Sequence, residues 1–392
     1  MKGFILNMFL FFTLILVFPL TKLIAQDHYD LIFTNIVLFD GYSFQPSVTV
    51  FIKNGIVEQV ITGNQDYRAT ATTVINGNGK TLMPGLINAH VHLQGKKENL
   101  KEAARAGVLT LLDLFNTSDT LRHYNDSSQY ASYFSAGICV TAPKGHGTEY
   151  GIDIPTITSP QEADNFVKSR ILEGSDYIKI ILESGSKGQT PSLNDSILYA
   201  VLNACKKYNK LSVVHISRAK DALRAFVAGA DGLAHIWTRD SIPISDKELE
   251  ILTQRPFFII PTLTVKEGTL ERHKKNGDPI TSMDMPGFYK EVYRLYKKNI
   301  PILAGTDCPN EGVNFGTDLY KEINAFINAG MSPSDALKSA TSAPANAFHL
   351  TDRGIIAKGK RADLLLVKGN LSDGILKTDS IIGIWKAGIR IK

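Results

Sequence analysis

The stretch Thr81–Gly95, TLMPGLINAHVHLQG, runs from apolar residues through a Pro-Gly turn to two histidines with one residue between them. Side chains at positions i and i+2 of a strand point to the same face, so His90 and His92 would lie together at a strand end. The pair is compatible with two metal ligands or with two packed core histidines. The rest of the chain has to decide between these interpretations.

Short apolar runs alternate with amphipathic helical patterns from about residue 84 to residue 350. The runs are GLINAHVH (85–92), GVLTLLDL (107–114), AGICVTA (136–142), YIKIIL (177–182), LSVVHI (211–216), GLAHI (232–236), FFIIPTL (257–263) and IPILAGTD (300–307). This alternation predicts an α/β fold, with a (β/α)8 TIM barrel over residues 84–350. A doubly wound open sheet is the alternative, but no glycine-rich nucleotide-binding motif follows any of these runs.

Both ends of the chain have a different pattern, in which Ile, Val, Phe and Thr runs alternate with turn residues. Residues 31–63 contain Asp-Gly and Asn-Gly breaks that are typical of hairpins. Residues 362–392 repeat this pattern, with a turn expected at Lys-Ala-Gly. We therefore expect segments 26–83 and 351–392 to form one small β-sandwich domain, with the barrel inserted between them.

The first 25 residues are mostly apolar, with Lys2 near the start and Ala25 at the end. This composition predicts a secretory signal peptide over residues 1–25, and hence a periplasmic or secreted protein. An uncleaved membrane anchor is the alternative, because the run approaches the length that spans a bilayer. Three cysteines allow one disulfide at most, so we expect a large core rather than disulfides to stabilise the exported chain.

The charge of the chain argues against a nucleic-acid partner. The formal net charge is +5, and part of it lies in the first 25 residues. No basic run longer than a pair stands out, as a nucleic-acid surface would require. We expect a small-molecule substrate, no nucleic acid, and no membrane contact beyond the signal peptide. A homo-oligomer remains open, since no sequence pattern reports on it.

Three more residues with metal-binding side chains fall at the ends of apolar runs. His215 and His235 end their runs, and Asp307 ends IPILAGTD. The carboxyl ends of barrel strands build the active site, so we expect these groups to converge with His90 and His92. Imidazole and carboxylate are suitable ligands for Zn²⁺ and similar ions. Five matching positions favour a metal site over five independent core residues.

Lys179 lies inside the apolar run YIKIIL. Burial and nearby metal cations would both favour its neutral amine. A neutral lysine can add CO₂ and become a carbamate, which is a carboxylate able to bridge two metals. The alternatives are a side chain that extends to the barrel rim and an ion pair with Glu183.

The motifs PGLINAHVHL, DYIKI, VVHIS, GLAHI and AGTDCPN, in this order, resemble those of the amidohydrolase superfamily. The resemblance is to its imidazolonepropionase-like and prolidase-like branch, and it extends from about residue 30 to the end. Residues 330–367 resemble the segment that closes the barrel in that family and returns the chain to the β-domain.

The resemblance implies two divalent metals per chain, with zinc expected and manganese, cobalt or iron as alternatives. The implied ligands are His90, His92 and Asp307 for the more buried metal, His215 and His235 for the second, and carbamylated Lys179 as the bridge. Asp307 is also the implied catalytic residue, which would carry a proton from the metal-activated hydroxide to the leaving amine.

Substrate contacts are expected from the loop Ala142–Gly151, APKGHGTEYG, which resembles a substrate loop of related enzymes. His146 and Tyr150 are candidates to hold a carboxylate or carbonyl; a flexible glycine-rich loop is the alternative. Arg218 is a candidate partner for a substrate carboxylate, and an exposed arginine at a helix start is the alternative. Ser217 stands where prolidase-like members often have tyrosine, which separates this chain from a strict prolidase pattern.

Together these residues predict an exported metal-dependent hydrolase that cleaves a C–N bond in an amide, cyclic amide or dipeptide. An ester, lactone or phosphotriester hydrolase would use the same ligands. A non-catalytic exported binding protein is an alternative from another class. The presence of Asp307 with the full ligand set argues against it, because a binding protein needs no proton shuttle.

Overall fold

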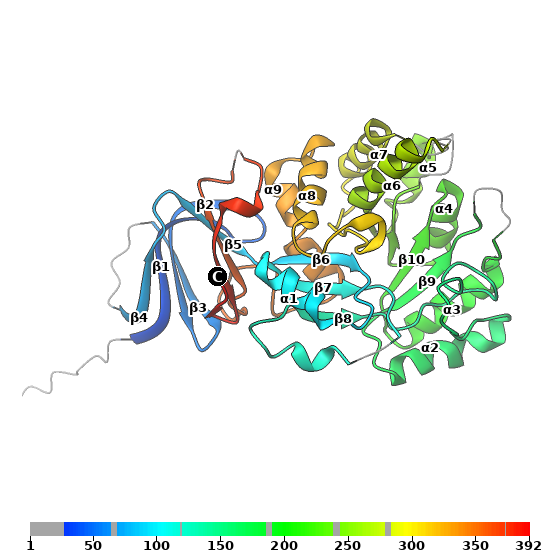
Figure 1. Cartoon of the computed structure of the whole chain (residues 1–392), viewed down its shortest axis with the longest axis horizontal. Helices are drawn as coiled ribbons and strands as arrows, with labels where there is room; N and C mark the ends of the chain where they lie inside the picture. Colours follow the sequence, from blue (N-terminus) through cyan, green and yellow to red (C-terminus); the bar gives the residue numbers. More distant parts are fainter. Residues whose placement is uncertain are drawn as a thin grey trace, which may run out of the picture.

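Figure 1 shows the computed structural model of the chain, in which a sheet at one end adjoins a larger body of parallel strands and helices. The structure describes residues 27–63, 69–117, 120–185, 190–237, 244–278, 284–372 and 374–392. The expected signal peptide, residues 1–25, lies outside the described residues. No helix in the described ranges has the length and apolarity that crossing a bilayer requires.

One eight-stranded mixed sheet contains strands from both ends of the chain. Its strands are β1 (Asp27–Phe39), β2 (Phe44–Lys53), β3 (Ile56–Thr62), β4 (Ala69–Asn76), β5 (Lys80–Pro84), β13 (Leu364–Lys368), β14 (Ile381–Lys386) and β15 (Ile389–Arg390). The order β15-β14-β13-β5-β1-β2-β3 brings the two ends together, and β4 pairs with β1 in parallel. These strands form one hydrogen-bonded sheet, so the expected β-sandwich is not confirmed.

Two-residue turns with positive φ close the hairpins at both ends of the chain. Asn54 (φ 52°) and Gly55 (φ 75°) connect β2 to β3. Ala387 (φ 47°) and Gly388 (φ 74°) connect β14 to β15. Turns of this kind match the right-handed twist of the paired strands, which is why an Asn-Gly pair is a strong hairpin signal.

The central part of the chain forms two parallel sheets. Their strands are β6 (Leu86–Val91), β7 (Val108–Asp113), β8 (Ser132–Ser135), β9 (Ile178–Leu182), β10 (Ser212–Ile216), β11 (Gly232–Ala234) and β12 (Phe258–Ile260). The orders are β6-β7-β8 and β9-β10-β11-β12. Isolated parallel bridges join Val140 to Ile180, Ile259 to Ile302, and Val91 to Cys308. The α/β fold is confirmed, but the described strands pair as two arcs and not as one closed barrel.

Two of the eight expected strands differ from the structure. The third sheet strand is β8, which ends before residue 136, and residues 136–142 contribute only a bridge at Val140. The run 300–307 contributes only a bridge at Ile302, and Cys308, directly after the run, contributes another. Positive φ values occur in both segments, at Gly137 within the first and at Asp307, the last residue of the second.

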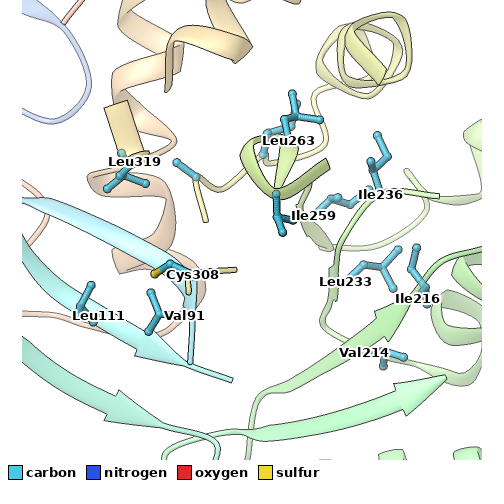
Figure 2. Close-up of a cluster of buried hydrophobic side chains, with 14 of the residues drawn as sticks. Val91, Leu111, Val214, Ile216, Leu233, Ile236, Ile259, Leu263, Cys308 and Leu319 are labelled. Atoms are coloured by element: carbon cyan, nitrogen blue, oxygen red, sulfur yellow. The ribbon is translucent and has the colours of Figure 1, made fainter. Parts of the chain in front are cut away.

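Helices cover the outer side of the parallel strands (Figure 1). They are α1 (Lys97–Arg105), α2 (Ala163–Leu172), α3 (Asp195–Lys207), α4 (Ala219–Ala228), α5 (Asp246–Ile251), α6 (Leu263–Asn276), α7 (Met285–Lys297), α8 (Asp318–Asn328), α9 (Pro333–Lys338) and α10 (Ser342–Ala347). Figure 2 shows part of the buried core between both layers, where Leu319 of α8 and Leu263 of α6 lie near Ile259 and Cys308.

Strand alternation separates this core from the residues that face inward. In β9, Ile178, Ile180 and Leu182 belong to the core cluster under the helices. Lys179 and Ile181 alternate with them and therefore point to the opposite side of the sheet. This alternation directs Lys179 toward the interior of the parallel strands.

Glu322 of α8 is fully buried against the first turn of α6. Its carboxylate accepts hydrogen bonds from the backbone N–H groups of Leu263 (2.8 Å) and Thr264 (2.7 Å) and from the Thr264 hydroxyl (2.7 Å). Burial raises the pKa of Glu322 from its ordinary 4.5 to about 7, although these hydrogen bonds oppose the shift. A carboxyl group with a raised pKa stabilises the fold most at low pH.

The Glu322→Gln variant should therefore change how stability depends on pH. The contribution of the protonated carboxyl is complete below about pH 4.5 and is lost as the pH rises through about 7. Between pH 5 and pH 8, wild type should lose about 3 kcal/mol of unfolding free energy relative to the variant. Urea denaturation at both pH values measures this difference. The exposed Glu271→Gln is the control, and equal pH slopes for wild type and Glu322→Gln would contradict the assignment.

Candidate active site

The predicted ligands meet at the carboxyl ends of the parallel strands. Asp307 Oδ1 lies 3.3 Å from His90 Nε2 and 3.0 Å from His92 Nε2, and the two Nε2 atoms are 3.3 Å apart. The ring centroids of His90 and His235 are 4.8 Å apart, and those of His215 and His235 are 4.5 Å apart. The structure thus brings the four histidines and Asp307 together in one cluster.

Backbone hydrogen bonds hold the ligand-bearing segments against each other. Asp307 N–H donates to the carbonyl of His90 (2.8 Å), and His92 N–H donates to that of Cys308 (2.8 Å). A Cβ atom on Gly305 would lie 2.8 Å from the Cβ of His90 and 2.4 Å from Ile260, so this close approach requires glycine. Asp307 itself has a φ of 60°, a strained value that such surroundings can impose.

The protonation states of the cluster fit a divalent cation. Burial, followed by the charge of Lys179, holds the pKa of His90 well below its ordinary value, and burial lowers that of His215 to about 3. Burial would raise the pKa of Asp307, but His90 and His92 lower it below the ordinary range. Neutral imidazoles around an ionised carboxylate are the forms that bind metal.

Unpartnered buried atoms support the same fit. Nδ1 of His90, Nδ1 of His92 and Nζ of Lys179 are buried without a hydrogen-bond partner among the described residues. Because buried polar groups are normally paired, such atoms indicate a missing ligand or modification. His90, His235 and Asp307 in particular offer three ligand atoms within 4.8 Å of one another.

Lys179 is 2% exposed, so its side chain does not extend to the rim. Burial lowers its pKa to about 7. Glu183 makes other contacts: its Oε1 accepts from Gly185 N–H (2.5 Å) and its Oε2 lies 3.7 Å from His215 Nε2. Nζ of Lys179 has no hydrogen-bond partner among the described residues, and its burial favours the neutral amine from which a carbamate forms.

Of the three expected substrate-binding residues, His146 and Tyr150 lie at the cluster and Arg218 does not line its cavities. His146 lies beside the cluster, with its ring 4.9 Å from that of His215, and its Nδ1 lies 2.5 Å from Glu149 Oε1. Tyr150 follows in the same loop and lines the same cavities as His146. Arg218 donates to the carbonyl of Gly185 (2.9 Å) and is not among the described residues that line these cavities. Its salt bridge to substrate stays a prediction without a supporting contact.

Several residues that support the cluster were not predicted. Thr262 Oγ1 lies 2.8 Å from Nδ1 of His235, and Thr262 has a φ of 55°, which is rare for a β-branched residue. Asn310 Nδ2 donates to Asp307 Oδ1 (3.0 Å). Asp113 accepts from the N–H of Leu93, next to the ligand pair. Thr262 and Asp113 both stand at the ends of apolar runs, so the rule that found the histidines could also have found them.

The Thr262→Val variant should bind metal about 10- to 100-fold more weakly, because it loses the hydroxyl that orients His235. Valine keeps the shape and the branched Cβ, so the backbone strain is unchanged. Competition with a chromogenic chelator measures the metal affinity. Thr253→Val is the control, since the described hydrogen bond of that hydroxyl is to the carbonyl of Glu250 in α5. Equal affinity in both variants would exclude this role of Thr262.

Comparison with known proteins agrees with this geometry. The sequence profile of the family described as "Amidohydrolase family" matches residues 81–392. The chain belongs to the amidohydrolase family. Members of this family generally bind divalent metals, and the His/Asp cluster provides suitable ligands.

Individual amidohydrolases are distant in sequence. An adenine deaminase from Methanoregula boonei is 24% identical over 341 residues, which cover 86% of this chain and 55% of the deaminase. An imidazolonepropionase from Cutibacterium acnes is 36% identical over 78 residues, 20% of this chain and 19% of that enzyme. A solved Xaa-Pro dipeptidase with bound methionine in the active site is 24% identical, with a TM-score of 0.79 over 92% of this chain and 99% of that one.

These matches confirm the superfamily and agree with the branch that the motifs indicated. The dipeptidase is similar to this chain in fold. At 24% sequence identity, the similarity supports no conclusion about the substrate of this chain. The family match supports a metal-dependent hydrolase that acts on carbon–nitrogen bonds. Its particular substrate and partners are proposals, since it spans little more than half of the deaminase.

Proposed function

We propose that this amidohydrolase is an exported enzyme that hydrolyses the C–N bond of an amide, cyclic amide or dipeptide. The observation that carries the proposal is the contact of Asp307 Oδ1 with both His90 and His92, at 3.3 and 3.0 Å. Export rests on the composition of residues 1–25, which predicts a periplasmic or secreted protein.

We also propose that the parallel strands close into a (β/α)8 barrel over residues 84–350, with segments 26–83 and 351–392 as a small β-domain. The three isolated bridges support closure, because they connect both arcs at each side through parallel contacts. The similarity in fold to the Xaa-Pro dipeptidase over 92% of this chain is consistent with this arrangement.

His90, His92 and Asp307 would hold one metal, His215 and His235 the second, and carbamylated Lys179 would lie between them, with zinc as the expected ion. Such metals supply an activated water and a polarised carbonyl. The described contacts of the Asp307 carboxylate all use Oδ1, so Oδ2 can accept the proton of the water and pass it to the leaving amine. His146, held by Glu149, and Tyr150 would orient the substrate.

A substrate screen on protein with measured metal content tests the proposal. The panel contains N-acyl amino acids, dipeptides, hydantoin-like rings, and esters and lactones, since the same ligands would serve ester hydrolysis. About two metals per chain together with amide turnover is the expected result. No metal and no turnover, after reconstitution with divalent metal and bicarbonate, would contradict it.

A further inference from the structure

Two cavities, here called the first and second chambers, adjoin the ligand cluster. The residues between them contribute to the walls of both. The first chamber has a volume of about 450 Å³ and the second of about 490 Å³. Four residues line both: His146, Tyr150, His215 and Asn310. A substrate that spans both chambers would therefore pass directly over the ligand cluster.

The first chamber is the more apolar of the two, although Gln94, Asn116, Lys179 and Asn310 also line it. Its wall includes Leu114, Phe115, Ile152 and Ile181, and none of its described lining residues is an aspartate or glutamate. The ring of Phe115 lies 6.3 Å from that of Tyr150, centroid to centroid. These side chains offer a hydrocarbon group dispersion contacts and removal from water.

The second chamber is polar and charged. Its wall includes Glu183, Lys266, and the pair formed by Arg272 and Glu311, whose Nε–Oε2 distance is 2.8 Å. Ser217 also lines it, and the buried Oγ of Ser217 has no hydrogen-bond partner among the described residues. An unpartnered buried hydroxyl is a group that a polar substrate atom can satisfy.

The position of the proton shuttle gives the substrate a direction. Asp307 lines the second chamber and is not among the lining residues of the first. In hydrolysis, the oxygen of water forms a bond to the acyl carbon, the C–N bond breaks, and the proton of the water passes through Asp307 to the amine nitrogen. The leaving amine must therefore lie on the side of Asp307, in the second chamber.

We infer that the enzyme acts on amides of an apolar carboxylic acid with a polar amine. The hydrocarbon acyl group occupies the first chamber, and the amine part occupies the second. This inference rests on the proposed function and adds to it the class and the orientation of the substrate.

Two isomeric amides with the bond reversed test the orientation. Phenylacetyl ethanolamide has an apolar acyl part and a polar amine part, whereas 3-hydroxy-N-benzylpropanamide has the reverse. The metal-loaded enzyme should cleave the first with a kcat/KM at least about tenfold higher, since misplacing an apolar group is expected to have an effect of that size. Equal rates, or a preference for the second isomer, would overturn the inference.

A variant in the wall of the first chamber tests the same point. Ile152 is 42% exposed, so Ile152→Asn should fold normally. It should reduce the preference for phenylacetyl over acetyl ethanolamide about tenfold. Ile382→Asn, on β14 in the small sheet, is the matched control and should leave this preference unchanged. An unchanged preference in Ile152→Asn would contradict the placement of the acyl group.

The two levels of the proposal fail in different ways. If neither isomer is cleaved by enzyme that hydrolyses another amide of the screen, the substrate class is wrong and the proposed function stands. If the metal-loaded enzyme hydrolyses no amide at all, the proposed function is contradicted and the inference falls with it.

Discussion

Replacing Asp307 with asparagine should reduce kcat on an amide substrate by about 10³-fold, the usual effect of removing a general acid–base group. Asparagine keeps an oxygen at the Oδ1 position, where His90, His92 and Asn310 make their contacts. It cannot accept a proton at the position of Oδ2. The variant should therefore keep most of its metal and lose most of its turnover.

Steady-state kinetics and metal content per chain, measured on the same preparation, test this result. Asp278→Asn, which changes an exposed carboxylate after α6, is the control and should retain wild-type kcat. Full activity of Asp307→Asn would exclude the shuttle role. Complete loss of metal would show that Asp307 acts first as a ligand.

Replacing Lys386 with methionine should lower the free energy of unfolding by about 4 kcal/mol, because three backbone carbonyl groups would lose a buried charged donor. Lys386 of β14 is 2% exposed. Its Nζ donates to the carbonyls of Asn125 (2.8 Å), Ser127 (2.8 Å) and Tyr130 (2.7 Å). This ammonium therefore fastens the small sheet to the segment before β8.

Denaturant unfolding of Lys386→Met and of Lys368→Met tests this role. Lys368 lies at the end of β13 in the same sheet but is exposed, so its replacement should change stability by less than about 0.5 kcal/mol. Similar decreases in the free energy of unfolding of the two variants would show that the three carbonyl contacts of Lys386 do not stabilise the fold.

The ligand cluster could be predicted from the sequence because its signals are local. The two-residue period places His90 and His92 on one face, and the ends of apolar runs mark His215, His235 and Asp307. Each signal needs only a few neighbouring residues, and the parallel arrangement of the strands then brings them together. The roles of these residues in binding metal remain predictions.

The supporting contacts could not be predicted, since they depend on residues distant in sequence. The end of an apolar run marks Thr262 as a candidate, but its contact with His235 depends on the parallel pairing of β11 and β12, which no local pattern reports. The strand β4 was missed as well. Its sequence ATATTVIN lacks an apolar face, and it forms as the parallel partner of β1, where Thr70 and Thr72 contact His28.

The small sheet also has a consequence for the order in which the site can assemble during synthesis. Strand β5 leads through Gly85 directly into β6, which carries His90. Its partner β13 comes far later in the chain: Thr81 of β5 donates to the carbonyl of Gly369, directly after β13 and 288 residues on. Strand β5 leaves the ribosome long before β13. The first metal-ligand strand therefore gains its final anchor only after the whole segment between β5 and β13 has been synthesised, and metal loading is expected to follow that step.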